Sequence, residues 1–142
     1  MTETIPAPQA LLEAALYADD LGAAENFYGT VLGLQRVTRA EGRHVFFRIG
    51  PMMLLIFRAD ATQLGASDLS LPVPPHGATG EGHVCFAATA PEIQAWADRL
   101  SACGIAIEAD FHWPNGARSI YFRDPAGNSL EFSEPRLWFP DA

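Results

Sequence analysis

The chain repeats one structural plan twice, and this repeat constrains the fold more than any other feature. Residues 11–17 (LLEAALY) and residues 82–88 (GHVCFAA) both have the composition of a strand, and aligning them sets Glu13 opposite His83. A stretch with helical spacing of apolar residues follows each strand and ends at a glycine, Gly33 or Gly104. Glycine is typical of the position just after a helix because it tolerates positive φ. The repeat therefore predicts two strand-helix units of the same design.

Each unit continues into an apolar hairpin. The segment FFRIGPMMLLIF at 46–57 aligns with YFRDPAGNSLEF at 121–132, where Asp-Pro-Ala-Gly-Asn is strong turn chemistry. Further strands are predicted around 35–38 and 105–110, which complete a βαβββ pattern in each half. The predicted fold class is α+β, with two tandem βαβββ modules.

The length and composition predict a single domain, residues 1–142, with an ordinary hydrophobic content of 49%. A segment rich in Gly, Pro and Ser separates the two modules, as expected of a linker. The predicted boundaries are 11–58 for module one, about 59–81 for the linker, 82–134 for module two and 135–142 for a C-terminal tail.

The charge balance excludes several classes of partner. All nine basic residues are arginine and the net charge is −8, which argues against nucleic acid and against an anionic membrane surface.

The N-terminal residues lack the basic start and apolar run of a signal peptide, and the longest apolar run, 51–57, is too short to span a bilayer. We therefore expect a cytoplasmic protein.

Alternation along the strands places an unusual mixture of side chains on one face of the predicted sheets. Larger apolar residues fall on the face that meets the helices. The opposite face carries Glu13, His83 and Glu131 together with arginine, tyrosine and serine side chains. Such a mixture resembles the lining of a ligand cavity more than a dry core.

The sequence resembles the vicinal oxygen chelate superfamily, which groups glyoxalases, bleomycin resistance proteins and extradiol dioxygenases. The resemblance runs from about Leu11 to Glu134 and is most specific in DDLGAAENFYGTVLGL and YFRDPAGNSLEF. It implies two βαβββ modules whose mixed sheet forms an open cup with helices on its outer face. It also implies a homodimer and a divalent metal ion bound in the cup.

The resemblance also implies the metal ligands. The family's ligand positions correspond to Glu13, Ile56, His83 and Glu131, and Ile56 cannot bind a metal. One imidazole and two carboxylates suit Mn, Fe, Ni, Zn or Mg, and three protein ligands leave positions open for a substrate. Each ligand also has a structural explanation: Glu131 pairing with Arg123 or Arg48, His83 as a satisfied core residue, and Glu13 as a solvated strand end.

Other residues of the same face are candidates for contact with a small-molecule substrate. Glu131 and Glu13 are also the candidates for moving a proton in catalysis. The predicted substrate-binding residues are Arg48, Arg123, Tyr121, Tyr17, Trp113 and Phe46.

Two classes of function follow. The first is a metalloenzyme that chelates a small oxygenated substrate and carries out lyase or isomerase chemistry through an enolate-like intermediate. The alternative is a metal-free protein that resembles bleomycin resistance proteins and sequesters a cationic aromatic ligand, which suits the acidic charge and the aromatic residues Phe111, Trp113 and Tyr121. An extradiol dioxygenase fits less well because Glu13 replaces a histidine, and a fosfomycin-type transferase because the chain has no lysine.

Overall fold

The first half of the chain forms a four-stranded mixed sheet. The structure is a computed structural model that describes residues 4–141. The elements of this half are β1 (Glu13–Tyr17), α1 (Leu21–Asn26), the π-helical η1 (Phe27–Val31), β2 (Gln35–Ala40), β3 (His44–Ile49) and β4 (Met52–Phe57). The strand order is β1-β4-β3-β2, in which β1 is parallel to β4 and the other neighbours are antiparallel.

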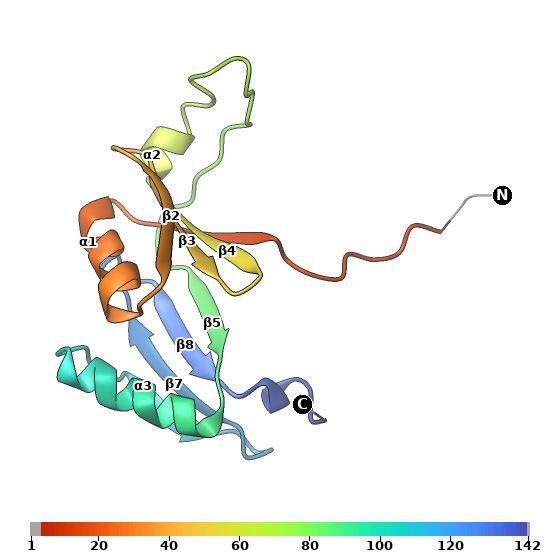
Figure 1. Cartoon of the computed structure of the whole chain (residues 1–142), viewed down its shortest axis with the longest axis vertical. Helices are drawn as coiled ribbons and strands as arrows, with labels where there is room; N and C mark the ends of the chain where they lie inside the picture. The colour runs from red at the N-terminus through yellow and green to blue at the C-terminus, as the bar shows by residue number, and fades with distance from the viewer. Residues whose placement is uncertain (1–3, 142) are drawn as a thin grey trace.

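The second half repeats this topology, which confirms the predicted α+β fold of two βαβββ modules. Its elements are β5 (His83–Ala87), α3 (Ala90–Ala102), β6 (Ala109–His112), β7 (Arg118–Arg123), β8 (Ser129–Ser133) and the 3-10 turn η2 (Pro135–Leu137). The order β5-β8-β7-β6 is that of the first sheet, again with one parallel pair. The strands form two separate open sheets, one above the other in Figure 1.

The helix boundaries follow the capping residues of the sequence. Asp20 accepts a hydrogen bond from the Ala23 amide at 3.0 Å and begins α1. Thr89 and Glu92 form a reciprocal capping box at the start of α3. A cap of this kind stabilises a helix by about 1 kcal/mol. Gly33 (φ 73°) and Gly104 (φ 74°) follow the two helical segments, as predicted.

Two predicted segments differ from the structure. The strand expected at 105–110 begins only at Ala109, so the preceding residues are irregular chain. The helix predicted from Leu21 to Leu32 changes at Phe27 into the π-helix η1. Because a π-helix widens the turn by one residue, it alters which side chains face the sheets, and the spacing of apolar residues does not reveal it.

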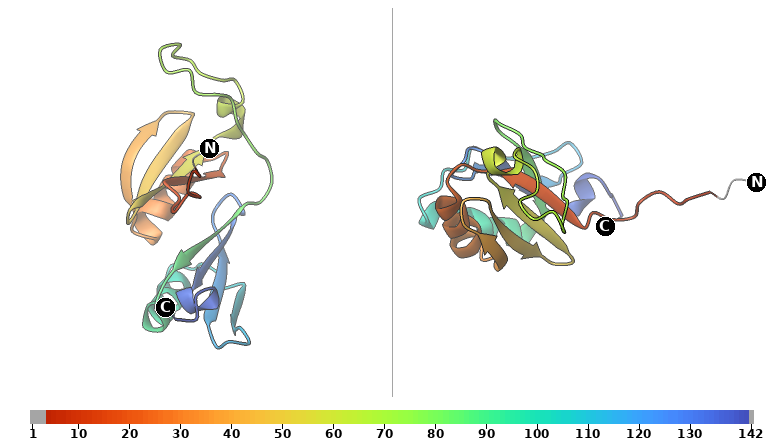
Figure 2. Two further views of the ribbon diagram at one scale, coloured as in Figure 1. Left: turned by 90° about the vertical axis from the view of Figure 1, so that its right-hand side faces the viewer. Right: turned by 90° about the horizontal axis from the view of Figure 1, so that it is seen from above.

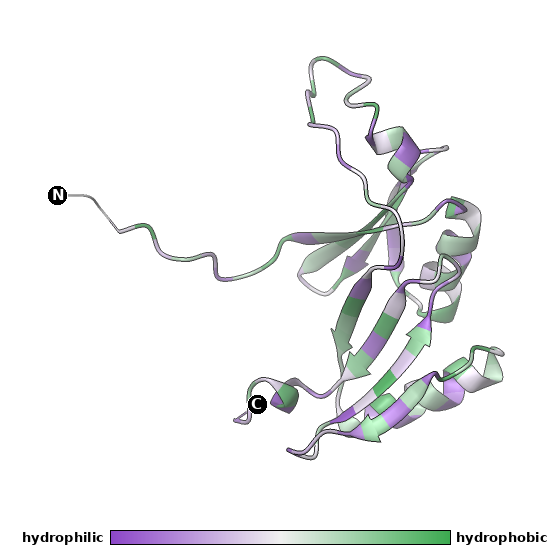
Figure 3. Cartoon of the chain, turned by 180° about the vertical axis from the view of Figure 1, so that it is seen from behind, coloured by the Kyte–Doolittle hydropathy of each residue, from purple (hydrophilic) through white to green (hydrophobic). Residues whose placement is uncertain are grey.

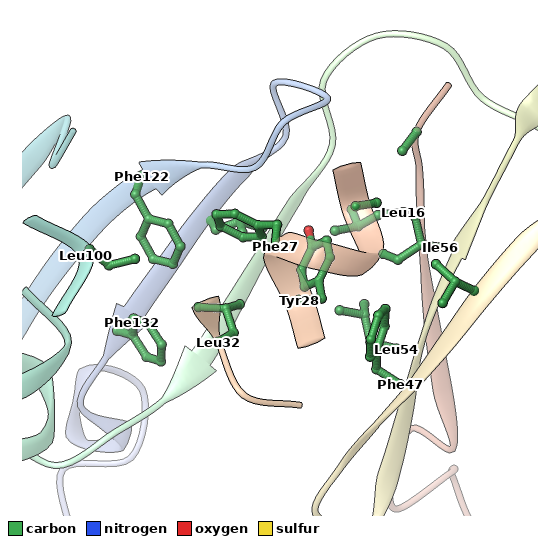
Figure 4. Close-up of a cluster of buried hydrophobic side chains, with 14 of the residues drawn as sticks. Leu16, Phe27, Tyr28, Leu32, Phe47, Leu54, Ile56, Leu100, Phe122 and Phe132 are labelled. Carbon is green, nitrogen blue, oxygen red and sulfur yellow. The ribbon is translucent and has the colours of Figure 1, made fainter. Parts of the chain in front are cut away.

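The hydrophobic core lies between the helices and the two sheets and joins both halves of the chain. Tyr28, Phe47 and Phe122 are fully buried members of one apolar cluster. Figure 4 shows Phe27 and Tyr28 between Phe122 and Phe132 of the second sheet and Phe47, Leu54 and Ile56 of the first. The core therefore occupies the helix side of both sheets and leaves their other faces for a site.

The linker extends beyond the sheets. It contains the short helix α2 (Ala59–Thr62) and then irregular chain, which projects from the body of the molecule in the left view of Figure 2. Within residues 4–141, no helix is both long and apolar enough to cross a membrane.

Candidate functional site

Glu131 lies at the centre of the second sheet, on the face away from the core. On neighbouring strands it is paired with Cys85 of β5 and Tyr121 of β7, so these three side chains point to the same side. Its relative exposure is 4%, which is unusual for a carboxylate. Hydrophilic and hydrophobic residues alternate along β8 in Figure 3. The alternation expected from the sequence thus places a buried carboxylate on the open face of this sheet.

A chain of hydrogen bonds holds one oxygen of Glu131. The Trp113 indole N–H donates to Ser119 Oγ at 2.8 Å, and the Ser119 hydroxyl donates to Glu131 Oε2 at 2.6 Å. Ser133 Oγ lies 2.9 Å from Ser119 Oγ. The indole can only donate, so the Ser119 proton is directed to the carboxylate. This chain fixes the carboxylate plane and leaves Oε1 for another partner.

That second partner is His83. Its Nε2 lies 3.5 Å from Glu131 Oε1, and its Nδ1 lies 2.9 Å from the carbonyl oxygen of Ser129. A carbonyl only accepts, so Nδ1 carries a hydrogen, and in the neutral ring Nε2 presents a lone pair toward the carboxylate. Either a proton on Nε2 or a cation between Nε2 and Oε1 satisfies this contact. A backbone carbonyl that orients a histidine in this way is the usual outer partner of a metal-binding imidazole.

The neighbours of Glu131 are held in their protonated forms. Burial raises the pKa of the Cys85 thiol to about 12, and the negative charge of Glu131 adds to this effect. Burial and the hydrogen-bonding and charge effects of Glu131 likewise raise the pKa of Tyr121 to about 12. At neutral pH both groups are therefore uncharged, and Cys85 lacks the thiolate that a nucleophile requires.

Glu13 is the predicted ligand that the chain does not bring to the other two. It begins β1 in the first sheet, where it is exposed and lines a cavity with Phe46 and Leu55. Among residues 4–141, no three histidine, cysteine or acidic side chains are close enough together to hold an ion. The expectation that all three ligands meet in a cup of one chain is therefore wrong. The physical reason is that the strands of each module pair only with one another, and the two sheets meet through the core.

The fourth ligand position lies at Leu55, one residue before the predicted Ile56. Cys85 is paired with Glu131, and at the same place in the first sheet Ala15 is paired with Leu55. Ile56 points the other way and is fully buried in the core. Leu55 therefore replaces Ile56 at this position, and a metal ligand is absent there in either case.

The predicted substrate-binding residues have different surroundings. Arg123 donates to Glu108 at 2.7 Å and to Glu81 at 3.1 Å, and Arg48 donates to the Gly50 carbonyl at 2.9 Å. Neither arginine pairs with Glu131 within the described part of the chain. The alternative in which Glu131 serves a structural ion pair with Arg48 or Arg123 is therefore not what the structure contains.

The aromatic candidates lie on the site faces of the two sheets. Tyr121 stacks on Phe111, with 5.9 Å between the ring centroids and 3° between the ring planes. It also stacks on His83, with 6.2 Å between the ring centroids. In the first sheet, Phe46 stacks on His44 at 4.0 Å. Trp113 is linked to the carboxylate of Glu131 by hydrogen bonds through the hydroxyl of Ser119.

Tyr17 and three further residues belong to these sites. The Tyr17 hydroxyl lies 2.7 Å from Nδ1 of His76 in the linker. Alternation places Ser119 on the face of Glu131, but no role was predicted for it, and none for His44 or His76. Strand alternation could have identified His44, which shares the face of Phe46. No local pattern identifies His76, because its position depends on how the linker folds back.

Comparison with known proteins identifies the family. Residues 10–132 match the family model of the Glyoxalase/Bleomycin resistance protein/Dioxygenase superfamily, so the chain belongs to this superfamily. A crystal structure described as lactoylglutathione lyase from Agrobacterium tumefaciens is 47% identical, with a TM-score of 0.88 over 94% of this chain and 98% of that chain.

More distant structures share the fold. A glyoxalase/bleomycin resistance protein/dioxygenase from Nocardioides is 27% identical, with a TM-score of 0.70 over 92% of this chain and 85% of that chain. An integron cassette protein from the mobile metagenome of V. cholerae is 22% identical, with a TM-score of 0.67 over 93% of this chain and 99% of that chain. At that identity the likeness concerns the fold alone.

Proposed function

We propose that the protein is a metal-dependent enzyme of the glyoxalase type, a lyase or isomerase that acts on a small substrate with neighbouring oxygen atoms. The observation that carries the proposal is the pair His83 and Glu131, whose Nε2 and Oε1 atoms face each other at 3.5 Å. The family and the 47% identity to a protein described as lactoylglutathione lyase support the same class of chemistry.

The donor set fits a divalent cation. One imidazole nitrogen and one carboxylate oxygen are already oriented, by the Ser129 carbonyl and by Ser119. These ligands suit Mn, Fe, Ni, Zn or Mg, and we propose Glu13 as the third. A divalent ion with open coordination positions supplies Lewis-acid activation of a bound carbonyl.

The proposed metal ligands lie on two different sheets, and this separation leads us to a homodimer. Glu13 lies on the open face of one sheet and the pair His83 and Glu131 on that of the other, so within one chain neither group forms a complete site. We propose that a second copy places its Glu13 opposite His83 and Glu131. Symmetry then creates two equivalent complete sites per dimer, because an interface of this type uses the same surfaces of both copies.

The side chains of the proposed site have separate roles. Glu131 Oε2 is committed to Ser119, so Oε1, the oxygen nearer His83, is the one that would hold the cation. Glu13 is exposed and lacks such a fixed orientation, which suits a group that takes a proton from substrate and returns it. Tyr121, which is paired with Glu131 on the neighbouring strand, stacks on Phe111 beside it.

Replacement of Glu131 tests the proposal. Wild-type protein purified without added metal is expected to contain close to one divalent ion per chain by elemental analysis, and Glu131→Gln is expected to lose it. Glu41→Gln, the same change at an 89% exposed carboxylate that pairs with Arg39, serves as the control and should keep its metal. Metal-free wild-type protein that also fails to bind added Mn²⁺, Ni²⁺ or Zn²⁺ contradicts the proposal and favours a sequestering protein instead.

A further inference from the structure

A cavity of about 560 Å³ lies on the open face of the first sheet, beneath the linker. Glu13 is part of its lining, so the cavity is continuous with the proposed third metal ligand. Most of the remaining lining is apolar or aromatic. Its main members are His44, Phe46, Leu55, Phe57, Val73 and His76.

The aromatic rings of this cavity hold one another in place. His44 stacks on Phe46 with 13° between planes, and Phe57 packs edge-on against Phe46 at 5.2 Å. His76 of the linker packs edge-on against Phe57 at 4.6 Å and is held by the Tyr17 hydroxyl at 2.7 Å. Such offset and edge-on pairs are the arrangements that aromatic rings prefer. The linker therefore supplies one wall of a pocket built of flat groups.

The rings present little charge. Burial and the neighbouring Arg43 lower the pKa of His44, which keeps this imidazole neutral at neutral pH. Two charged residues line the cavity, Arg43 and Glu13, and their charges are opposite.

Two arginines of the open faces already have partners. Arg123 is held by Glu108 and Glu81. Arg48 donates to the Gly50 carbonyl. Several free guanidinium or ammonium groups favour recognition of a multiply charged anion such as a glutathione adduct. The chain has no lysine, and Arg43 is the arginine of the cavity lining.

We infer that this cavity binds an uncharged, flat aromatic group of the substrate rather than a glutathione moiety. The inference rests on the proposed function, because it names the part of the substrate that extends from the metal into the cavity beside Glu13. Aromatic groups gain from burial against the ring faces and edges of Phe46 and Phe57, and a glutathione moiety would bring carboxylates into a pocket that offers them one arginine.

Nuclear magnetic resonance titration of the full chain with 2-naphthol, in the presence of a metal chelator, tests this inference. Backbone amide signals of Phe46, Phe57 and Val73 are expected to shift, and glutathione at the same concentration is expected to leave them unchanged.

Phe46→Ala is expected to weaken 2-naphthol binding at least about fivefold, as loss of one aromatic pair implies. Val73→Asp should weaken it without touching the core, since Val73 is 50% exposed. Leu69→Ala, in the same linker but 88% exposed, is the control and should bind as wild type does.

The outcomes separate this inference from the proposed function. Absence of 2-naphthol binding, equal affinity in Val73→Asp and wild type, or comparable binding of glutathione overturns the inference, while the metal analysis of Glu131→Gln stands apart from it. Binding of 2-naphthol by a protein that takes up no metal supports the pocket and rejects the enzyme.

Discussion

The Tyr28 hydroxyl donates a hydrogen bond of 2.6 Å to the Asp124 carboxylate, and this contact joins the two halves of the chain across 96 positions of sequence. Both residues are buried. Asp124 also accepts from the amides of Ala126 and Asn128 and from the Asn128 side chain, which in turn donates to the carbonyl of Tyr17. The turn Asp-Pro-Ala-Gly-Asn therefore does more than reverse the chain, since its acidic residue anchors the helix of module one to the hairpin of module two.

Replacement of Tyr28 with Phe is expected to destabilise the protein by about 2 kcal/mol, because it leaves a buried carboxylate oxygen without its hydroxyl donor. Burial and the Asp124 charge both raise the pKa of Tyr28, so this residue acts as a neutral donor throughout the accessible pH range. Urea unfolding at pH 7 measures the change. Tyr17→Phe is the matched control: it removes a hydroxyl that bonds to the exposed linker residue His76 and should cost less than about 1 kcal/mol. Equal costs for the two variants would contradict the role assigned to Asp124.

The repeat in the sequence predicted most of the fold because it depends on local patterns. Alternation, caps and turn residues locate β1, β5, β7 and β8 within two residues. The π-helix at Phe27 and the late start of β6 escaped prediction, because both depend on how side chains pack against the sheets rather than on residue spacing.

The site was predicted in part. Alternation placed His83 and Glu131 on one face, and the structure confirms their proximity. Alternation says nothing about how two sheets sit relative to each other, so it could not show that Glu13 lies apart from them. The one-residue error at Ile56 has a similar origin: both faces of β4 are apolar, so its sequence does not fix which face is buried.

Removal of the Ser119 hydroxyl is expected to weaken metal binding without unfolding the protein. Ser119 orients Glu131 by donating to Oε2 and is itself held by Trp113. Outer hydrogen bonds of this kind affect metal affinity about 10 to 100-fold. Calorimetric titration of Ser119→Ala with Mn²⁺ measures the effect. Ser129→Ala, whose hydroxyl takes no part in this chain of hydrogen bonds, is the control, and equal affinities in the two variants would contradict a positioning role for Ser119.

The ion pair between Asp110 and Arg118 gives stability a dependence on pH. Hydrogen bonds from Arg118 lower the pKa of Asp110 below its usual 3.8. A carboxylate with a lowered pKa in the folded state contributes stability above its unfolded pKa, and this contribution is lost as the pH falls through the folded pKa. Asp110→Asn should therefore lower the free energy of unfolding at about pH 6, by less than ~1 kcal/mol because the pair is partly solvated.

The difference between wild type and Asp110→Asn should disappear as the pH falls below the usual pKa of an aspartate. Urea unfolding across this range measures it. Added salt at neutral pH should reduce the difference as well, since it screens exposed charges. A difference that is the same at pH 6 and in strong acid would show that the amide changes packing rather than charge.

The proposed dimer makes a prediction about mixtures of inactive variants. If Glu13 of one copy completes the site formed by His83 and Glu131 of the other, then Glu13→Gln and Glu131→Gln each damage both sites of their own dimer. A mixed dimer collects both substitutions in one site and leaves the other intact. Refolding the two variants together in equal amounts should therefore restore about one quarter of the wild-type metal content, because about half of randomly formed dimers are mixed and each has one intact site. The variants refolded separately and then pooled are the control and should bind little metal. If co-refolding restores nothing although light scattering shows dimers, the ligands do not come from different copies, and the assignment of Glu13 to the metal fails.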